Sequence, residues 1–218
     1  MVEIIYEDEA VIVCHKAAGM PVQTSSVGTK DMVSELKKYL AKSSEGEPYI
    51  GPVHRLDQPV EGIVVFAKTQ KAAASLSEQV REGGGMHKEY LARVYGRIPK
   101  PCGRLEDYMI KERSNMSRIA GKNEKGAQKA VLEYTCIEED EYTQLLRIIL
   151  HSGRHHQIRL QLSHAGAPVL GDKRYGTAKA LDYANENGIK RLHLAAVRLE
   201  FTHPLSGIRK CFEADIKI

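Results

Sequence analysis

The sequence contains no tryptophan and only three phenylalanines, so leucine, isoleucine, valine and tyrosine must fill the core. No apolar run approaches the roughly 20 residues that a membrane-spanning helix needs. Residues 1–9 carry acids where a secretory signal peptide needs a basic start and an apolar core. These absences argue against a membrane protein and against a secreted one.

Cysteine is also scarce. The four cysteines, Cys14, Cys102, Cys136 and Cys211, lie far apart, and no two of them form a C-x-x-C pair. A disulfide framework or a zinc ribbon normally needs closer spacing or a shorter chain. We therefore expect reduced thiols and a cytoplasmic protein.

The remaining composition is that of a globular protein, with 42% hydrophobic and 28% charged residues. A length of 218 residues is enough for one large domain or two small ones. Because no internal repeat or low-complexity linker interrupts the chain, we expect a single domain over residues 1–218.

Positive charge is concentrated in one stretch. Of a net charge of +4, the whole excess lies between Arg147 and Arg174, where five basic residues face one acid, Asp172, and four histidines accompany them. Local positive charge on an otherwise neutral chain favours an anionic ligand, most simply phosphates. A solvated basic face is the alternative.

Short strands and helices alternate without the regular β-α-β order of a doubly wound sheet, which predicts an α+β fold. Helices are expected after Asp31 and Thr69, which can cap them, and over Arg154–Ala165 and 178–187. A loop is expected over residues 43–48. The expected strands are 4–6, 11–13, around Val53, 63–67, 90–95, 105–110, 130–137, 144–151 and 192–201.

The strongest local signal for chemistry is the segment His54-Arg55-Leu56-Asp57, which lies in a loop between two apolar strands. Loops held by rigid strands commonly present reactive side chains. A turn in which Asp57 only bonds to nearby backbone amides explains the segment equally well.

A second signal is Gly153 to Arg159, which reads GRHHQIR. An arginine here can donate a fork of hydrogen bonds to a carboxylate or a phosphate. His151 and His155 are four residues apart, but Gly153 lies between them, and neither an H-E-x-x-H pattern nor an acidic ligand is near. Phosphate contact or structural hydrogen bonding explains these histidines better than a metal does.

Five motifs in this order resemble those of the RluA-type RNA pseudouridine synthases, and the resemblance runs nearly end to end. They are the opening strand with Lys16–Val22 (KAAGMPV), His54–Asp57 (HRLD) with Gly62–Thr69 (GIVVFAKT), Lys88–Ala92 (KEYLA), Gly153–Arg159 with Pro168, Gly171-Asp172 and Tyr175-Gly176, and Phe201–Pro204 (FTHP).

The resemblance implies a mixed, mainly antiparallel sheet with flanking helices and a central RNA-binding cleft. It implies that Asp57 is the catalytic carboxylate that acts on a flipped-out uridine, as a nucleophile or as a base at the ribose. Tyr90 matches the tyrosine that packs against the base and assists proton removal at C5. Arg159 matches the arginine that pairs with the aspartate, and Arg55 the one that replaces the departed uridine in the helical stack.

The expected partner is structured RNA, either rRNA or tRNA, bound by a monomer that needs no cofactor and no metal. The RNA-binding residues we expect are His54, Arg55, Arg154, His156 and Arg174. The family often carries an N-terminal S4 domain, which we do not expect here. Further RNA contacts are therefore expected from Arg104–Lys129, which holds seven basic residues against four acids.

The sequence departs from the family pattern next to Asp57. Val60-Glu61-Gly62 stands where the family commonly has T-S-G, so a hydroxyl is lost and a second carboxylate gained. Ala17 replaces a proline, and His193 lies two residues before the family's histidine position. The change at Val60-Glu61 is expected to affect the rate and the choice of target, and none of these departures touches Asp57, Tyr90, Arg159 or Arg55.

Two other classes of function stay open. One is a non-catalytic RNA-binding or ribosome-assembly protein on the same fold, although Asp57, Tyr90 and Arg159 are all present. The other is a glycoside or nucleoside hydrolase, in which Glu61 would be the second carboxylate beside Asp57.

Overall fold

The computed structural model describes residues 2–24, 28–42 and 46–218 of the chain. They form two compact units. Unit 1 comprises Met1–Lys88 and Ala196–Ile216, and unit 2 comprises Glu89–Ala195 and Lys217–Ile218.

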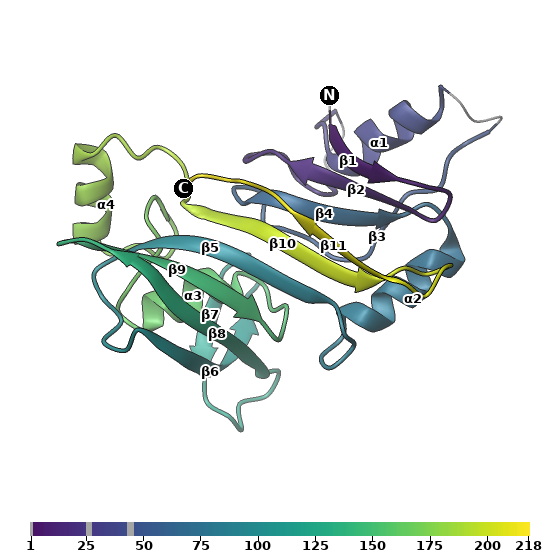
Figure 1. The fold of residues 1–218 in the computed structure, drawn as a ribbon. Helices are drawn as coiled ribbons and strands as arrows, with labels where there is room; N and C mark the ends of the chain where they lie inside the picture. Colours follow the sequence, from purple (N-terminus) through teal and green to yellow (C-terminus); the bar gives the residue numbers. More distant parts are fainter. Residues whose placement is uncertain (1, 25–27, 43–45) are drawn as a thin grey trace. The chain divides into compact units, whose positions relative to one another are not determined.

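In unit 1 the strands follow the order β1-β2-β4-β10, with β3 beside β4 and β11 beside β10 (Figure 1). The pairs β1–β2, β2–β4, β3–β4 and β10–β11 are antiparallel. Strand β4 is buried along nearly its whole length, as its unbroken apolar run predicts for a central strand. The strands are β1 (Glu3–Glu7), β2 (Val11–Lys16), β3 (Gly51–Pro52), β4 (Glu61–Ala67), β10 (Leu194–Thr202) and β11 (Arg209–Glu213).

Helices α1 and α2 belong to unit 1, and both begin at the predicted caps. Helix α1 (Met32–Leu40) starts after Asp31, whose side chain accepts from the backbone N–H of Ser34. Helix α2 (Gln70–Val80) starts after Thr69 and buries Leu76 against the core formed by the strands.

Unit 2 contains a second set of antiparallel pairs, in the order β5-β9-β8-β6-β7 (Figure 1). Along β5 every second side chain is buried, the period expected of a strand with one face on a core. The strands are β5 (His87–Tyr95), β6 (Cys102–Lys111), β7 (Ser117–Ala120), β8 (Gln128–Glu139) and β9 (Thr143–Leu150).

The helices of unit 2 are α3 (Gln157–His164) and α4 (Ala178–Glu186). The prediction that a helix runs from Arg154 is wrong, because His156 adopts a left-handed backbone conformation with φ of 56°. Residues with positive φ do not continue a right-handed helix. Arg154 therefore does not share a helix face with Ile158.

The predicted α+β class and mainly antiparallel sheet are confirmed. Val53 is not a strand residue, because β3 ends at Pro52. Part of the loop predicted over 43–48 lies outside the described residues. Among the helices of the described ranges, none has the length and apolar character to cross a membrane.

Candidate active site

Asp57 lies in the loop that joins β3 to β4 in unit 1. Its backbone carbonyl accepts from the N–H of Val60 at 3.0 Å, which closes a tight turn. Leu56 and Val60 are buried on either side of it, whereas Asp57 itself is half-buried. The apolar neighbours thus anchor the turn while the carboxylate stays at the surface of the unit.

The buried side chain of Lys16 anchors this loop. The side chain is fully buried, and Nζ donates to the carbonyls of Gln58 at 3.0 Å, Met20 at 2.7 Å and Ala17 at 3.3 Å. The N–H of Gly19 also donates to the Gln58 carbonyl, at 2.8 Å, and the Gln58 amide donates back to Gly19. The residue that follows Asp57 is therefore tied to the 16–20 turn by three hydrogen bonds.

The pKa of Lys16 reflects both its burial and the charges of the loop. Burial lowers the pKa of Lys16 to about 8, while the negative charges of Asp57 and Glu61 act in the opposite direction. Sequence reasoning did not assign Lys16 a role, and the only signal for it was the KAAGMPV motif in which it stands.

His54 and Arg55 occupy different environments in the same loop. The Nε2 atom of His54 accepts from the N–H of Val65 at 3.1 Å, and burial, with the nearby charge of Lys88, lowers the pKa of His54 to about 3. The imidazole is neutral at physiological pH, so a contact with RNA would not be ionic. Arg55 is exposed.

Tyr90 lies on β5 in unit 2, opposite Ile148 of β9. It is 6% exposed and shares the buried face of the strand with Ala92 and Val94. Because a strand fixes the direction of its side chains, Tyr90 sits on a more rigid element than Asp57 does.

Arg159, in the first turn of α3, forms a buried ion pair with Asp172. Its Nε donates to Oδ2 of Asp172 at 2.7 Å and its Nη2 donates to Oδ1 at 2.6 Å, which is the two-pronged geometry of a strong arginine–carboxylate pair. The side chains are 4% and 0% exposed. Sequence reasoning missed this partner, although Asp172 stands in a quoted motif.

Asp172 is held in turn by the backbone. Its Oδ1 accepts from the N–H groups of Arg174 at 2.9 Å and Tyr175 at 3.2 Å. Burial by itself raises the pKa of Asp172, but the hydrogen bond and charge of Arg159, with these two amides, hold the pKa below its ordinary value. The carboxylate is therefore ionised.

Tyr175 connects this pair to its surroundings in unit 2. Its ring lies under the Arg159 guanidinium, 5.3 Å from centroid to Cζ, and its hydroxyl accepts from the N–H of Ser117 at 2.8 Å. The same hydroxyl lies 2.8 Å from Nδ1 of His156. His156, whose backbone is in the left-handed conformation, therefore contacts Arg159 indirectly, through the Tyr175 side chain.

The other basic residues predicted to bind RNA have partners inside unit 2. Nε of Arg154 donates to the carbonyl of Lys129 at 2.9 Å, and Nη1 of Arg174 donates to the carbonyl of Asn115 at 2.9 Å. Within 104–129, Lys129 pairs with Glu106 and Arg118 pairs with Glu124. Lys129 and Arg118 are thus paired with neighbouring acids, whereas Arg154 and Arg174 are anchored by backbone carbonyls.

The predicted catalytic residues are divided between the units: Asp57 belongs to unit 1, and Tyr90 and Arg159 belong to unit 2. Across 2–24, 28–42 and 46–218, no three histidine, cysteine, aspartate or glutamate side chains converge in a way that suits a metal ion.

Comparison with known proteins identifies the family. Residues 10–164 match the family described as RNA pseudouridylate synthase, and the matched range includes Asp57, Tyr90 and Arg159. The chain belongs to this family. The prediction of an RNA pseudouridine synthase, an isomerase, is therefore confirmed.

Individual relatives agree with this. The chain is 34% identical to tRNA pseudouridine synthase C of Pasteurella multocida, over 94% of the chain and 87% of the relative. It is 33% identical to ribosomal large subunit pseudouridine synthase C of the same organism, over 94% of the chain but only 61% of the relative.

A solved structure shares the fold. Human RNA Pseudouridylate Synthase Domain Containing 4 superposes with a TM-score of 0.79 at 21% identity, covering 99% of this chain and 88% of that one.

Proposed function

We propose that this protein isomerises uridine to pseudouridine in rRNA or tRNA, with Asp57 as the catalytic carboxylate and Tyr90 and Arg159 as its catalytic partners. The observation that carries the proposal is the Asp57 turn, in which a half-buried carboxylate stands between buried anchors and beside a buried lysine. The relatives named above modify tRNA or large-subunit rRNA, which supports these two RNA classes.

The reaction suits these residues. The bond between N1 of uracil and C1′ of ribose breaks, a bond from C5 to C1′ forms, N1 gains a proton and C5 loses one, so nothing is oxidised or hydrolysed. A uridine within folded RNA must be flipped out before these atoms can be reached. Asp57 acts at the ribose as nucleophile or base, and the Tyr90 ring offers a stacking surface for the base.

Arg159 is the residue proposed to hold Asp57 ionised and oriented. A guanidinium has two edges that can each bind a carboxylate, and Asp172 takes the Nε–Nη2 edge. His54, Arg55, Arg154, His156 and Arg174 are proposed as RNA contacts.

We further propose that one catalytic domain over residues 1–218 includes both units, because the family match begins in unit 1 and ends in unit 2. We also propose that the protein is a cytoplasmic monomer. Light scattering coupled to gel filtration should give the monomer mass of 24.3 kDa, and a doubled mass would contradict the monomer.

Product analysis tests the proposed activity. Transcripts of the organism's tRNAs and large-subunit rRNA, labelled with tritium at uridine C5, are incubated with the protein, and nucleosides are then separated. We expect tritium release with an equal amount of pseudouridine, and no free uracil. Free uracil would instead identify a hydrolase, and bound but unchanged RNA would identify a non-catalytic binder.

A further inference from the structure

The ion pair between Arg159 and Asp172 suggests a role for an aspartate that never needs to touch RNA. Asp172 is fully buried, and its two oxygens accept four hydrogen bonds, two from Arg159 and two from the backbone of the next turn. A buried arginine without such a partner would be costly. The same bonds also fix the plane and direction of the guanidinium.

We propose that Asp172 is a positioning residue: it orients Arg159 for catalysis through their bidentate pair, and the Tyr175 ring supports the face of the guanidinium. This inference rests on the proposed function, because it requires Arg159 to act in the reaction. It adds a residue whose effect on turnover runs entirely through Arg159.

The arrangement around Asp172 supports orientation rather than mere stability. The backbone amides of Arg174 and Tyr175 both donate to Oδ1, so the carboxylate cannot rotate without losing them. Tyr175 is fixed at its other end by Ser117 of β7. The guanidinium is thus set by a strand, a turn and a helix together. An error of about 1 Å in such a group reduces turnover by roughly 100-fold.

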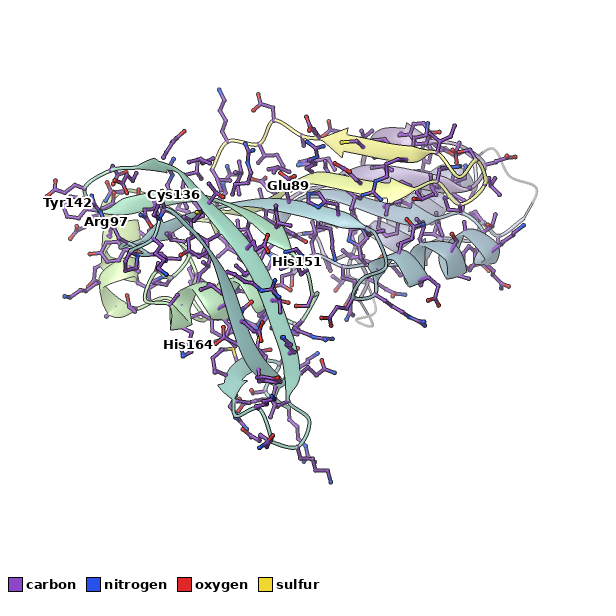
Figure 2. The ribbon with its side chains drawn as sticks, turned by 60° about the horizontal axis from the view of Figure 1, so that its bottom comes forward. Glu89, Arg97, Cys136, Tyr142, His151 and His164 are labelled. Carbon is purple, nitrogen blue, oxygen red and sulfur yellow. The ribbon has the colours of Figure 1, made fainter. Side chains whose placement is uncertain are left out.

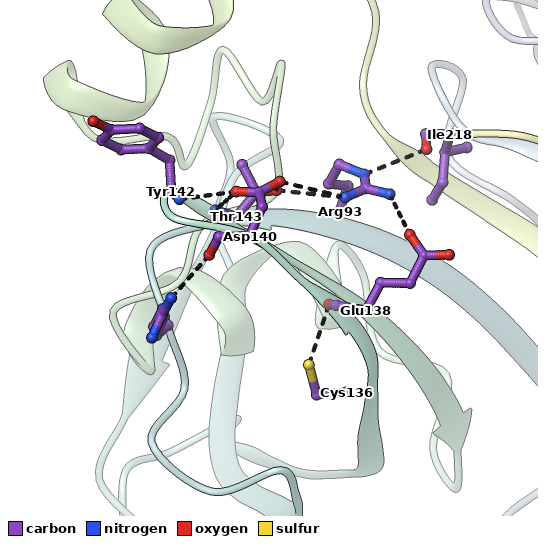
Figure 3. A network of polar contacts seen from close by, with 8 residues as sticks. Arg93, Cys136, Glu138, Asp140, Tyr142, Thr143 and Ile218 are labelled. Carbon is purple, nitrogen blue, oxygen red and sulfur yellow. Dashed lines mark hydrogen bonds and ion pairs between the residues drawn. The ribbon is translucent and has the colours of Figure 1, made fainter.

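Unit 2 contains a matched control. Asp140 in the β8–β9 turn also accepts, through Oδ1, from the N–H groups two and three residues later, at 2.8 and 2.7 Å (Figure 3). An arginine, Arg93, also lies beside it, 4.0 Å from Nη1 to Oδ2. This second aspartate is 54% exposed, and the partners of its carboxylate are Arg93, Tyr142 and Thr143. Asp140→Asn therefore removes the same kind of charge from the same kind of turn.

The experiment is a double-mutant cycle with Asp172→Asn, Arg159→Met and the double variant, measured on RNA in single turnover with RNA affinity determined separately. We expect Asp172→Asn to lower the catalytic rate about 100-fold while affinity for RNA changes less than threefold. In the Arg159→Met background, Asp172→Asn should cause no further loss, because its effect passes through Arg159. Asp140→Asn should stay within threefold of wild type.

Asp172→Glu covers the case in which Asp172→Asn does not fold. It keeps the charge and the pair but moves the guanidinium by about one methylene, and we expect roughly a tenfold lower rate with unchanged affinity. Rates within threefold of wild type for the folded variants, or losses that add to that of Arg159→Met, would overturn the inference. If Arg159→Met itself keeps full activity, the catalytic assignment of the proposed function fails instead.

Discussion

The Asp57 loop of unit 1 and the Arg159 segment of unit 2 fix a charged side chain in opposite ways. Around Asp57 the bonds described hold the backbone: Lys16 and Gly19 bind the carbonyl of Gln58, and the carboxylate itself is half-buried. Arg159 is held by its own side chain, which is almost fully buried.

Under the proposed function, this difference separates the group that reacts from the group that orients it. A carboxylate that must reach ribose needs exposure, so its position has to be fixed through hydrogen bonds to the backbone of its loop. A guanidinium that only needs to present a fixed charge can be buried, provided that a carboxylate pairs with it.

The largest expected effect is on turnover and comes from Asp57, the more exposed of the two charged groups. Asp57→Asn keeps the size of the side chain but removes its charge, so we expect pseudouridine formation to fall to background while RNA affinity stays within about threefold. Tritium release and filter binding measure the two quantities. A near-normal rate for this variant would place the reactive group elsewhere.

The next effect is on stability, at Gly62 in β4, just after the Asp57 loop. Gly62 has φ of 131°, and a Cβ there would lie 2.2 Å from the carbonyl oxygen of Ala196. We expect Gly62→Ala to lower the free energy of unfolding by about 3 kcal/mol. Gly207→Ala is the control, since Gly207 also has positive φ but open space around it, and about 1 kcal/mol is expected. Equal losses, measured by denaturant titration, would show that no close approach constrains the loop.

Lys16 gives a pH-dependent effect. Its pKa of about 8 in the folded protein lies below the ordinary value, so between pH 8 and about 10.5 the unfolded chain binds more protons. The free energy of unfolding should therefore rise with pH across this window, by up to about 3 kcal/mol. Below pH 8 the contribution is constant.

Lys16→Met should remove that rise, and should cost about 1–3 kcal/mol at pH 7 because three backbone carbonyls lose the hydrogen bond from Nζ. Unfolding titrations of both proteins at several pH values provide the measurement. Identical pH slopes for the two proteins would mean that Lys16 does not titrate in this window.

The smallest effect concerns RNA affinity at the surface of unit 2. If Arg174 meets a phosphate, Arg174→Ala should shallow the slope of log K against log salt by about 0.7 to 0.9. Arg97→Ala is matched to it, because Arg97 likewise donates to a backbone carbonyl, that of Asp140, in the region of Tyr142 (Figure 2). We expect no change of slope for Arg97→Ala. An unchanged slope for Arg174→Ala would limit Arg174 to its contact with Asn115.

Much of the fold could be predicted because it rests on local patterns. Residues close together in the sequence determine the caps at Asp31 and Thr69 and the alternation along β5. The start of α3 could not be predicted, because a left-handed histidine at position 156 has no sequence signature comparable to that of glycine.

The predicted site residues were likewise found from motifs, but the contacts that hold them in place could not be predicted in this way. Lys16 meets the Gln58 carbonyl 42 residues later, and Arg159 meets Asp172 13 residues later, so no helical or strand period connects them. Such pairs arise from how the chain folds back on itself, which only the structure shows.

Mapping of pseudouridine in total RNA tests the central claim most directly. RNA from cells with the gene, without it, and complemented with wild type or Asp57→Asn is compared site by site. We predict that at least one pseudouridine in tRNA or large-subunit rRNA disappears with the gene, returns with wild type and does not return with Asp57→Asn. An unchanged pseudouridine map, or full restoration by Asp57→Asn, would contradict the account.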